Sequence, residues 1–385
     1  MNPRLETALD SAAAIVLFFV VFSLPACTRE PAVAPPEEKG YLYIGLVAPR
    51  SGPLVAVGDG LVQGAEMAVK EANDSSETRA RPIRLLFEDE AAPLPAKKRL
   101  ASDPRVPLLV GHVLERKLER SRGLYVKAGR PVLLPVLASS QAPALGEGLF
   151  FRIMASEASQ AEALARFARE KRSAKSALIV HEDSRTGRLM AAAFNRVFSA
   201  EAQVRVETAL YQAEQKEALA LAGRAADFKP DVVFLALQTQ PAIHLTQTFS
   251  EAGVKTVFLG TSTLAVSDAV AWLGRLPHFT YVCLPFNPEE TGEAWQAFVQ
   301  RYKRRHHRPP DWPGVAAYDA VKLAVKALDQ AGDKPEAVRD YLNKLTGPPH
   351  IHHGLAGDYY FPSAGQGVGP VFVVQVKAAL LGLVP

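Results

Sequence analysis

The side chains best suited to chemistry in this sequence are histidines that stand together. His350, His352 and His353 lie near the C-terminus, and His306 and His307 follow a basic run. Histidine clusters bind metal ions such as Zn²⁺ when other ligands complete the set. No carboxylate or cysteine completes a convincing set at either place, so a polar loop and a solvated helix end are the alternative interpretations. We expect no metal site.

Three glycines, Gly58, Gly60 and Gly64, resemble a loop that binds a nucleotide. Their spacing is GxGxxxG rather than the GxGxxG of dinucleotide-binding loops, and it begins ten residues after the first apolar run. We therefore interpret it as the start of a helix. The chain has no GxxxxGKS/T, HExxH or GxSxG motif, and residues 181–183 (His-Glu-Asp) have no nucleophile or metal motif beside them. We expect neither an enzyme nor a cofactor.

Composition restricts the class of protein further. Hydrophobic residues make up 48% of the 385 residues and charged residues 22%, which is typical of a globular chain long enough for two domains. The net charge of +4 is spread along most of the chain, so we expect no nucleic-acid partner. The two cysteines, Cys27 and Cys283, are too far apart for a CxxC zinc site and argue against a disulfide framework.

The N-terminal segment has the pattern of an export signal. Residues 12–24 are almost continuously apolar, which is shorter than the roughly 20 residues of a membrane-spanning helix. The run ends in Leu24-Pro25-Ala26-Cys27, and small residues before a cysteine resemble a bacterial lipobox. We predict that residues 1–26 are a lipoprotein signal peptide, that Cys27 carries the lipid, and that the Pro-rich, charged residues 27–40 form a tether. An ordinary signal peptide, or an anchor helix with a chance cysteine, is the alternative.

From residue 41, short apolar runs alternate with longer segments of helical period. This alternation predicts parallel sheets with crossover helices. The pattern occurs twice, so we expect two similar α/β lobes. The strand candidates are residues 41–48, 83–87, 108–111 and 132–134, then 176–181, 203–210, 231–237 and 256–260. Three helices at 293–306, 315–331 and 334–345 precede closing strands at 359–361 and 371–376.

The connection after the first strand has a recognisable sequence. Residues 45–53 read Gly-Leu-Val-Ala-Pro-Arg-Ser-Gly-Pro, and Gly58, Gly64, Ala65 and Ala68 follow. This resembles the first motif of type I periplasmic binding proteins of the leucine/isoleucine/valine-binding class. Segments that resemble later motifs follow in the family's order at 110–112, 131–135, 151–152 (the first crossover), 231–234, 252–260, 317–321 and 354–365.

The resemblance covers nearly all of residues 41–377. It implies two doubly wound parallel-sheet lobes joined by three crossovers, with the ligand in the cleft between them. The first lobe would comprise residues 41–154 and 286–350, and the second residues 155–285 and 351–377. In such sheets, ligands lie beyond the carboxyl ends of the strands, where loops and helix N-termini offer unpaired N–H groups.

The resemblance and the strand ends together nominate nine ligand-binding candidates: Ser51, Glu115, Arg116, Ser139, Ser140, Thr186, Gln238, Thr239 and Thr261. Several positions depart from the family's amino-acid pocket. Val57 replaces a cleft aromatic residue, residues 113–117 (Val-Leu-Glu-Arg-Lys) replace a hydroxyl-rich loop, and Ala242 replaces an acid. A free amino acid needs a paired anion and cation site. We therefore expect a different small polar or carboxylate-bearing ligand, with Arg116 as a carboxylate partner. A solvated helix start at residues 115–117 is the alternative.

These inferences predict a lipid-anchored solute-binding protein of the cell envelope that delivers a small molecule to an ABC permease. The alternative is a regulator of the same fold that acts on a cell-wall synthase or a sensor kinase, which the altered pocket and Thr28 after the cysteine would fit. The basic run at residues 301–308 either contacts anionic headgroups or forms the C-terminal turn of a helix.

Overall fold

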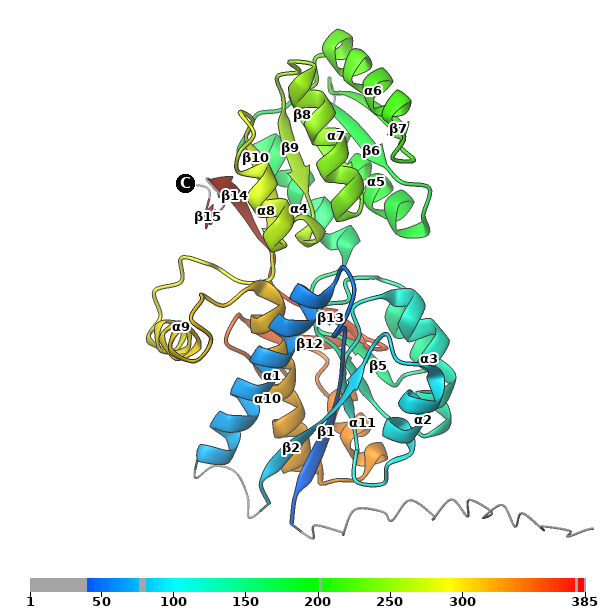
Figure 1. The fold of residues 1–385 in the computed structure, drawn as a ribbon, viewed down its shortest axis with the longest axis vertical. Helices are drawn as coiled ribbons and strands as arrows, with labels where there is room; N and C mark the ends of the chain where they lie inside the picture. Colours follow the sequence, from blue (N-terminus) through cyan, green and yellow to red (C-terminus); the bar gives the residue numbers. More distant parts are fainter. Residues whose placement is uncertain (1–39, 76–80, 201–202, 378–379, 384–385) are drawn as a thin grey trace, which may run out of the picture. The chain divides into compact units, whose positions relative to one another are not determined.

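The computed structural model describes residues 40–75, 81–200, 203–377 and 380–383, and Figure 1 shows the chain from Gly40 onward as two sheets with helices packed on them. The predicted signal peptide, Cys27 and all of the tether except Gly40 lie outside the described residues. Among the helices that are described, none is long and apolar enough to cross a membrane.

The first sheet is mainly parallel and has eight strands within the described residues. Its parallel part comprises β1 (Leu42–Ala48), β2 (Ile83–Asp89), β3 (Leu109–Gly111), β4 (Val132–Leu134) and β5 (Phe150–Arg152). At one edge, β13 (Gln366–Val368) runs parallel to β5, and β12 (Asp358–Ser363) and β11 (His352–His353) follow in antiparallel pairing. β1 and β2 pair in register over their full length, so they end at the same edge of the sheet.

The second sheet repeats this plan with seven strands in the described part of the chain. Its parallel strands are β6 (Ser176–His181), β7 (Arg205–Leu210), β8 (Val232–Ala236), β9 (Val257–Gly260) and β10 (Thr280–Leu284). β14 (Phe372–Lys377) pairs antiparallel with β10, and β15 (Leu380–Leu383) pairs antiparallel with β14. The strand order β15-β14-β10-β9-β8-β6-β7 places β6 and β8 in the interior of the sheet, where every residue except His181 is buried.

Helices cover both faces of the first sheet because successive strand residues point to opposite sides. Ile44 and Leu46 of β1 share a buried cluster with α1 (Val55–Asp74) and α10 (Trp312–Ala331). Tyr43 and Val47 of the same strand share another with α2 (Leu94–Ser102) and α3 (Glu115–Lys127). The apolar run of β1 is therefore a strand buried on both faces, as the sequence pattern predicts.

The second sheet is covered in the same way. Ile179 and Phe234 pack with α4 (Glu157–Glu170) and α5 (Arg185–Phe198). Leu178 and Val233 pack with α6 (Gln215–Phe228), α7 (Thr239–Glu251) and α8 (Ser267–Leu273). The remaining helical segments are α9 (Glu293–His306), α11 (Pro335–Asn343) and the short 3₁₀ turns η1 (Ala142–Gly146) and η2 (Ser262–Leu264).

The helices α1 and α10 lie side by side against the first sheet (Figure 1). Two glycines permit their close approach, since a Cβ on Gly64 would lie 1.9 Å from the carbonyl oxygen of Gly314. The three glycines of the GxGxxxG spacing lie in the first half of α1, in agreement with their interpretation as the start of a helix, and Gly64 serves the packing of α1 on α10.

The basic run at the end of α9 is largely paired with acids. Arg301 Nε contacts Glu71 at 2.8 Å, and Arg305 Nη2 contacts Glu66 at 3.3 Å, both on α1. Arg308 Nη1 contacts Asp311 at 2.8 Å. Half or less of each of these arginine side chains is exposed, and the ion pairs of Arg301 and Arg305 attach α9 to α1.

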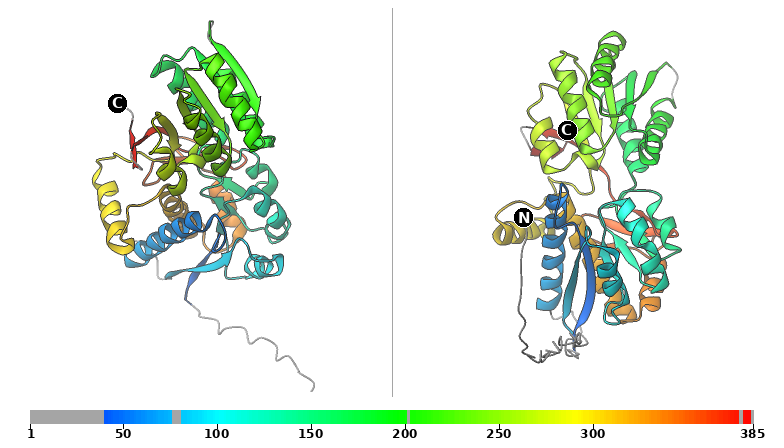
Figure 2. Two further views of the ribbon diagram at one scale, coloured as in Figure 1. Left: turned by 45° about the horizontal axis from the view of Figure 1, so that its top comes forward. Right: turned by 45° about the vertical axis from the view of Figure 1, so that its right-hand side comes forward.

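The last strands correct part of the expected domain division, which assigned residues 351–377 to the second lobe. β11, β12 and β13 instead belong to the first sheet, and only β14 and β15 extend the second, as the red segments in Figures 1 and 2 show. Arg152 Nη2 donates to Gln366 Oε1 at 2.8 Å, and a Cβ on Gly367 would lie 1.7 Å from the Arg152 carbonyl oxygen. A glycine at this position therefore lets β13 lie against β5.

The expected fold class is confirmed: the chain forms two doubly wound, mostly parallel α/β sheets. The chain passes between the sheets after β5, after β10 and after β13. Residues 151–152, expected to form the first crossover, are the end of β5, and the crossover follows them. The antiparallel strands at one edge of each sheet are an addition to the predicted pattern.

Candidate functional site

All nine predicted ligand-binding residues follow the carboxyl ends of parallel strands. In the first sheet, Ser51 follows β1, Glu115 and Arg116 follow β3, and Ser139 and Ser140 follow β4. In the second sheet, Thr186 follows β6, Gln238 and Thr239 follow β8, and Thr261 follows β9. The fold thus brings each set to one edge of its sheet, where parallel α/β proteins bind ligands. Their part in binding stays a prediction.

The serines of the first sheet differ in environment. Ser51 is exposed in the loop between β1 and α1. Ser139 is 3% exposed, and its Oγ accepts the backbone N–H of Gln141 at 3.2 Å. The carbonyl oxygen of Ser140 accepts Gln366 Nε2 at 2.7 Å, which connects this turn to β13. The turn at Ser139 and Ser140 is therefore held by the protein itself.

Thr239, Thr261 and Thr263 of the second sheet form a set connected through their hydroxyl groups. Thr261 and Thr263 join their hydroxyls at 2.9 Å, and Thr239 Oγ1 donates to the carbonyl oxygen of Thr263 at 2.9 Å. Thr186 lies in the first turn of α5, which Ser184 caps by accepting the N–H of Gly187 at 2.9 Å. These hydroxyls line the ends of β6, β8 and β9, as the sequence predicts.

The N-terminus of α3 is already occupied by an internal carboxylate. Glu90 Oε1 accepts the backbone N–H groups of Val113 and Leu114 at 3.0 and 3.2 Å and contacts His112 Nδ1 at 3.1 Å. Helix N-termini attract anions through such unpaired N–H groups. Because Glu90 is 2% exposed and supplies that anion, a ligand carboxylate has no access to these two donors.

The Glu90 contact depends on the buried His112. This histidine has φ 66° and is fully buried, and its Nε2 lies 3.0 Å from the hydroxyl of Tyr125 on α3. Burial raises the pKa of Tyr125 far above its ordinary value, so the phenol keeps its proton and can donate it to Nε2. The chain Glu90–His112–Tyr125 therefore fixes the loop between β3 and α3.

Three carboxylates collect around the start of α4. Glu157, its first residue, is partly buried, and its pKa is raised to about 7. The causes are burial and the charges of Glu115 and Glu182, opposed by the charge of Arg152. Glu115 follows a strand of the first sheet and Glu182 a strand of the second. The carboxyl-end edges of both sheets thus contribute to one negative region.

Two of these carboxylates lack a partner of their own. Glu182 accepts Ser184 Oγ at 2.8 Å and the N–H of Gln238 at 3.4 Å. Glu115 and Glu157 form no side-chain hydrogen bond and no ion pair with any residue that the structure describes. Like charges brought together at partial burial are unfavourable unless a cation joins them. This arrangement is suited to a positively charged group.

Arg152 does not neutralise the cluster directly. Its side chain is 4% exposed, and it donates to the carbonyl oxygen of Met154 and to Gln366. Burial lowers its pKa to about 10, with Glu157 opposing that change. Arg152 therefore connects β5 with β13 beside two of the crossovers.

Neither Glu157 nor Glu182 is among the nine predicted ligand-binding residues. Glu157 is the first residue of α4, a helix that is not among the predicted elements, and a single acid after Ser156 has no distinguishing pattern. The sequence feature that could have pointed to Glu157 as a binding residue is its position directly after the first crossover. For the described residues, no group of three His, Cys, Asp or Glu side chains is arranged to hold a metal ion. His353 instead pairs with Asp358 at 2.7 Å, and His352 is buried separately.

The fold and this edge define a class of protein. The chain belongs to the family described as periplasmic binding proteins, whose profile matches residues 42–379. This is a family of non-enzymatic solute-binding proteins of ABC transporters, so the expected family and the expected absence of enzymatic activity are confirmed. The chain accordingly has the type of fold that captures a solute outside the cytoplasm.

Individual relatives are distant but cover most of the chain. The leucine-, isoleucine-, valine-, threonine-, and alanine-binding protein of Pseudomonas aeruginosa is 21% identical over 313 residues, which are 79% of this chain and 83% of the relative. The Leu/Ile/Val-binding protein of Escherichia coli K12 is 22% identical over 305 residues, or 78% and 82% of the two chains.

Solved structures agree in fold. A leucine-binding protein from Thermotoga maritima superposes with a TM-score of 0.76 at 16% identity, over 89% of this chain and 98% of that one. A solute-binding protein from R. palustris in complex with benzoate superposes with a TM-score of 0.70 at 20% identity, over 89% and 95%. Solved structures of this fold thus include a leucine-binding protein and a complex with benzoate.

Proposed function

We propose that this protein is the lipid-anchored solute-binding component of an ABC importer and that it captures a small polar molecule with a cationic group. The family and the position of the nine candidate residues support the capture of a solute. The observation that carries the ligand class is the carboxylate cluster of Glu115, Glu157 and Glu182, two of which have no partner in the described chain.

The charges around the strand ends favour a cation over an anion. A ligand ammonium would offset the burial and the repulsion from Glu115 and Glu182 that together raise the pKa of Glu157. A ligand carboxylate would find the N–H groups of Val113 and Leu114 already bound by Glu90. Arg116, exposed in the first turn of α3, is the remaining partner for a carboxylate on the same ligand.

Binding by this fold requires no covalent chemistry. A ligand that binds groups from the edges of both sheets is held most tightly when both edges contact it. Ligand binding therefore favours a closed arrangement, in which the two edges come together on the ligand. A permease can then recognise the closed form. The second candidate function, a regulator that reports to another envelope protein, uses the same binding step with a different partner.

The test is a titration of the purified full chain with metabolite fractions separated into cationic, neutral and anionic compounds. We expect binding that depends on Glu157, detected by thermal shift and calorimetry, only from the cationic or zwitterionic fractions. Glu157→Gln should weaken that binding at least tenfold, while Glu119→Gln on the exposed side of α3 should leave it unchanged. Binding by the anionic fraction alone would contradict the ligand class, and no binding by any fraction would contradict solute capture.

A further inference from the structure

A pocket lies at the opposite end of the first sheet from the predicted ligand edge. Its volume is about 640 Å³, and Leu42 and Ile83, the first residues of β1 and β2, line it. The predicted ligand residues instead follow the last residues of such strands, and a seven-residue strand is roughly 20 Å long. The two places are therefore separate sites. We call this one the α10 pocket, because residues 318–329 of α10 form one wall of it.

One part of the α10 pocket is apolar. Leu42 and Ile83 from the sheet, Ala72 from α1, and Val325 and Leu328 from α10 line it. Pockets of roughly 300–1,000 Å³ with mainly apolar walls and a few polar groups are typical of sites for small organic molecules. The pocket is therefore large enough for a ligand with a hydrocarbon or aromatic body, and its apolar wall suits such a body.

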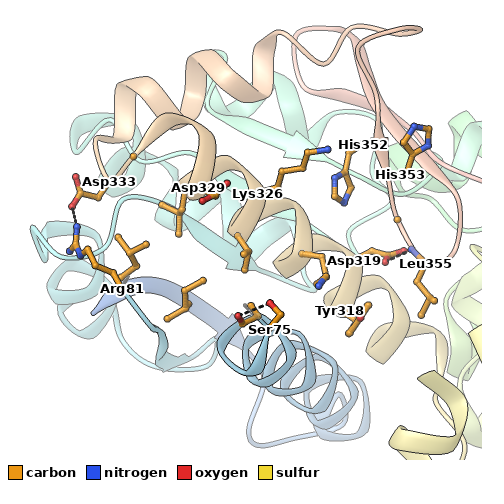
Figure 3. Close-up of a pocket in the computed structure, with 18 of the residues that line it drawn as sticks. Ser75, Arg81, Tyr318, Asp319, Lys326, Asp329, Asp333, His352, His353 and Leu355 are labelled. Carbon is orange, nitrogen blue, oxygen red and sulfur yellow. Dashed lines mark hydrogen bonds and ion pairs between the residues drawn. The ribbon is translucent and has the colours of Figure 1, made fainter. Parts of the chain in front are cut away.

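The polar part centres on a buried histidine. His352 is 5% exposed, and neither of its ring nitrogens has a hydrogen-bond partner among the residues described. Figure 3 shows Lys326 extending toward His352, at the end of the pocket away from Arg81. Burial, together with the charges of Lys326, His353 and Lys322, lowers the pKa of His352 to about 4. The ring is therefore neutral at pH 7, with one nitrogen able to donate and the other to accept.

The two lysines in this pocket are available to a ligand. Within the described chain, Lys322 and Lys326 form neither a hydrogen bond nor an ion pair. An uncharged imidazole with an unused N–H next to two unpaired ammonium groups forms a donor set suited to an anion.

The acids of the pocket are engaged elsewhere. Asp333 pairs with Arg81 at 2.7 Å at the other end of the pocket (Figure 3). Asp319 accepts two backbone N–H groups at 2.7 and 2.9 Å and a tyrosine hydroxyl at 2.8 Å. Asp329 Oδ2 accepts a hydrogen bond from Gln330 Nε2 at 2.9 Å. The acids therefore leave the two ammonium groups without a direct counterion.

We propose that the α10 pocket binds a small organic carboxylate with an apolar body. The carboxylate lies between Lys322 and Lys326 and accepts the N–H of His352, and the body lies along Leu42, Ile83 and Val325. An inorganic anion would use only the polar part, and a neutral apolar molecule would leave the lysines and the histidine without partners.

The experiment uses the purified full chain and two probes of nearly equal size, 4-phenylbutyrate and its neutral amide. We expect calorimetry to detect 4-phenylbutyrate binding that falls at least tenfold in the Lys322→Gln/Lys326→Gln double variant. Lys98→Gln, an exposed lysine on α2, is the matched control and should bind normally. Glu157→Gln, at the other site, should also bind normally. The ¹⁵N-histidine resonance that disappears in His352→Gln should shift when the probe is added.

Four outcomes would overturn the proposal. These are an unchanged affinity in the double variant with a wild-type melting temperature, equal binding of the amide, binding of inorganic phosphate in place of 4-phenylbutyrate, and a loss of binding in Glu157→Gln. The last would place the probe at the predicted ligand edge. If the double variant is less stable than the wild type, the His352 resonance of the wild-type protein tests the proposal instead. A probe bound in the α10 pocket must change that resonance, and an unchanged resonance would contradict the proposal.

Discussion

Glu157→Gln should stabilise the protein above neutral pH while it weakens ligand binding. In the folded chain, burial and the charges of Glu115 and Glu182 raise the pKa of Glu157 from its ordinary 4.5 to about 7. A carboxyl group with a raised pKa holds its proton more strongly in the folded state, so folding is penalised once the pH exceeds the unfolded value of 4.5. The penalty develops between about pH 4.5 and pH 7 and is complete above pH 7.

The size of the effect follows from the change in pKa. The full change corresponds to about 3 kcal/mol, and partial exposure with solvent screening reduces this to about 1–2 kcal/mol. For a folded unit of this length, with an unfolding entropy of roughly 2 cal/mol/K per residue, the melting temperature of Glu157→Gln should rise by about 1–3 °C at pH 8. Most of that gain should be absent at pH 5, where the wild-type carboxyl is already largely protonated.

The assay is thermal unfolding of the wild type, Glu157→Gln and Glu119→Gln at pH 5 and pH 8. Glu119→Gln should behave as the wild type at both pH values, because its side chain is exposed on α3. Binding of a cationic ligand to the wild type should also weaken as the pH falls below about 7, since Glu157 loses its charge. An equal gain at both pH values, or no gain at pH 8, would refute the like-charge explanation.

Two further predictions concern the core and the N-terminus. Gly64→Ala should cost about 2–4 kcal/mol in unfolding free energy, because its Cβ would meet the carbonyl oxygen of Gly314 at 1.9 Å. Gly123→Ala on α3, with nothing within 4 Å of its Cβ, should be neutral or stabilise by about 0.5–1 kcal/mol, and equal losses in both would contradict the packing argument. Cys283 is 1% exposed and should react with a thiol reagent only after unfolding. If Cys27 carries a lipid, the unfolded chain should then show one reactive thiol, and two would contradict the anchor.

The proposed ligand class is the point at which the sequence and the structure point most differently. The sequence suggests that the family's acid is missing at Ala242 and predicts Arg116 as a carboxylate partner, which stays a prediction. In the structure, the charges of Glu115 and Glu182 act on Glu157, and these three acids come from different parts of the chain. The structure also saturates the N-terminus of α3 with Glu90. Neither arrangement follows from the spacing of residues, because each depends on which strand ends become neighbours.

The sequence alone determined the two α/β halves and most of their elements. The predicted strands at residues 132–134 and 176–181 and the predicted helix at 293–306 match β4, β6 and α9 residue for residue. Hydrophobic periodicity is a local property, and these segments are buried by the faces that the periodicity indicates. The sequence also predicted the loops that carry the nine candidates, because the carboxyl ends of parallel strands lie at the same edge of a sheet, where ligands bind.

Tertiary structure decided everything that depends on contacts distant in sequence. It placed β11–β13 in the first sheet rather than the second, because Gln366 bonds to Arg152 across more than 200 residues of chain. It assembled the Glu157 cluster from both sheets and the α10 pocket from strands, helices and a late loop. Periodicity specifies which face of a segment is buried, but the partner against which that face packs is chosen only when the whole chain folds.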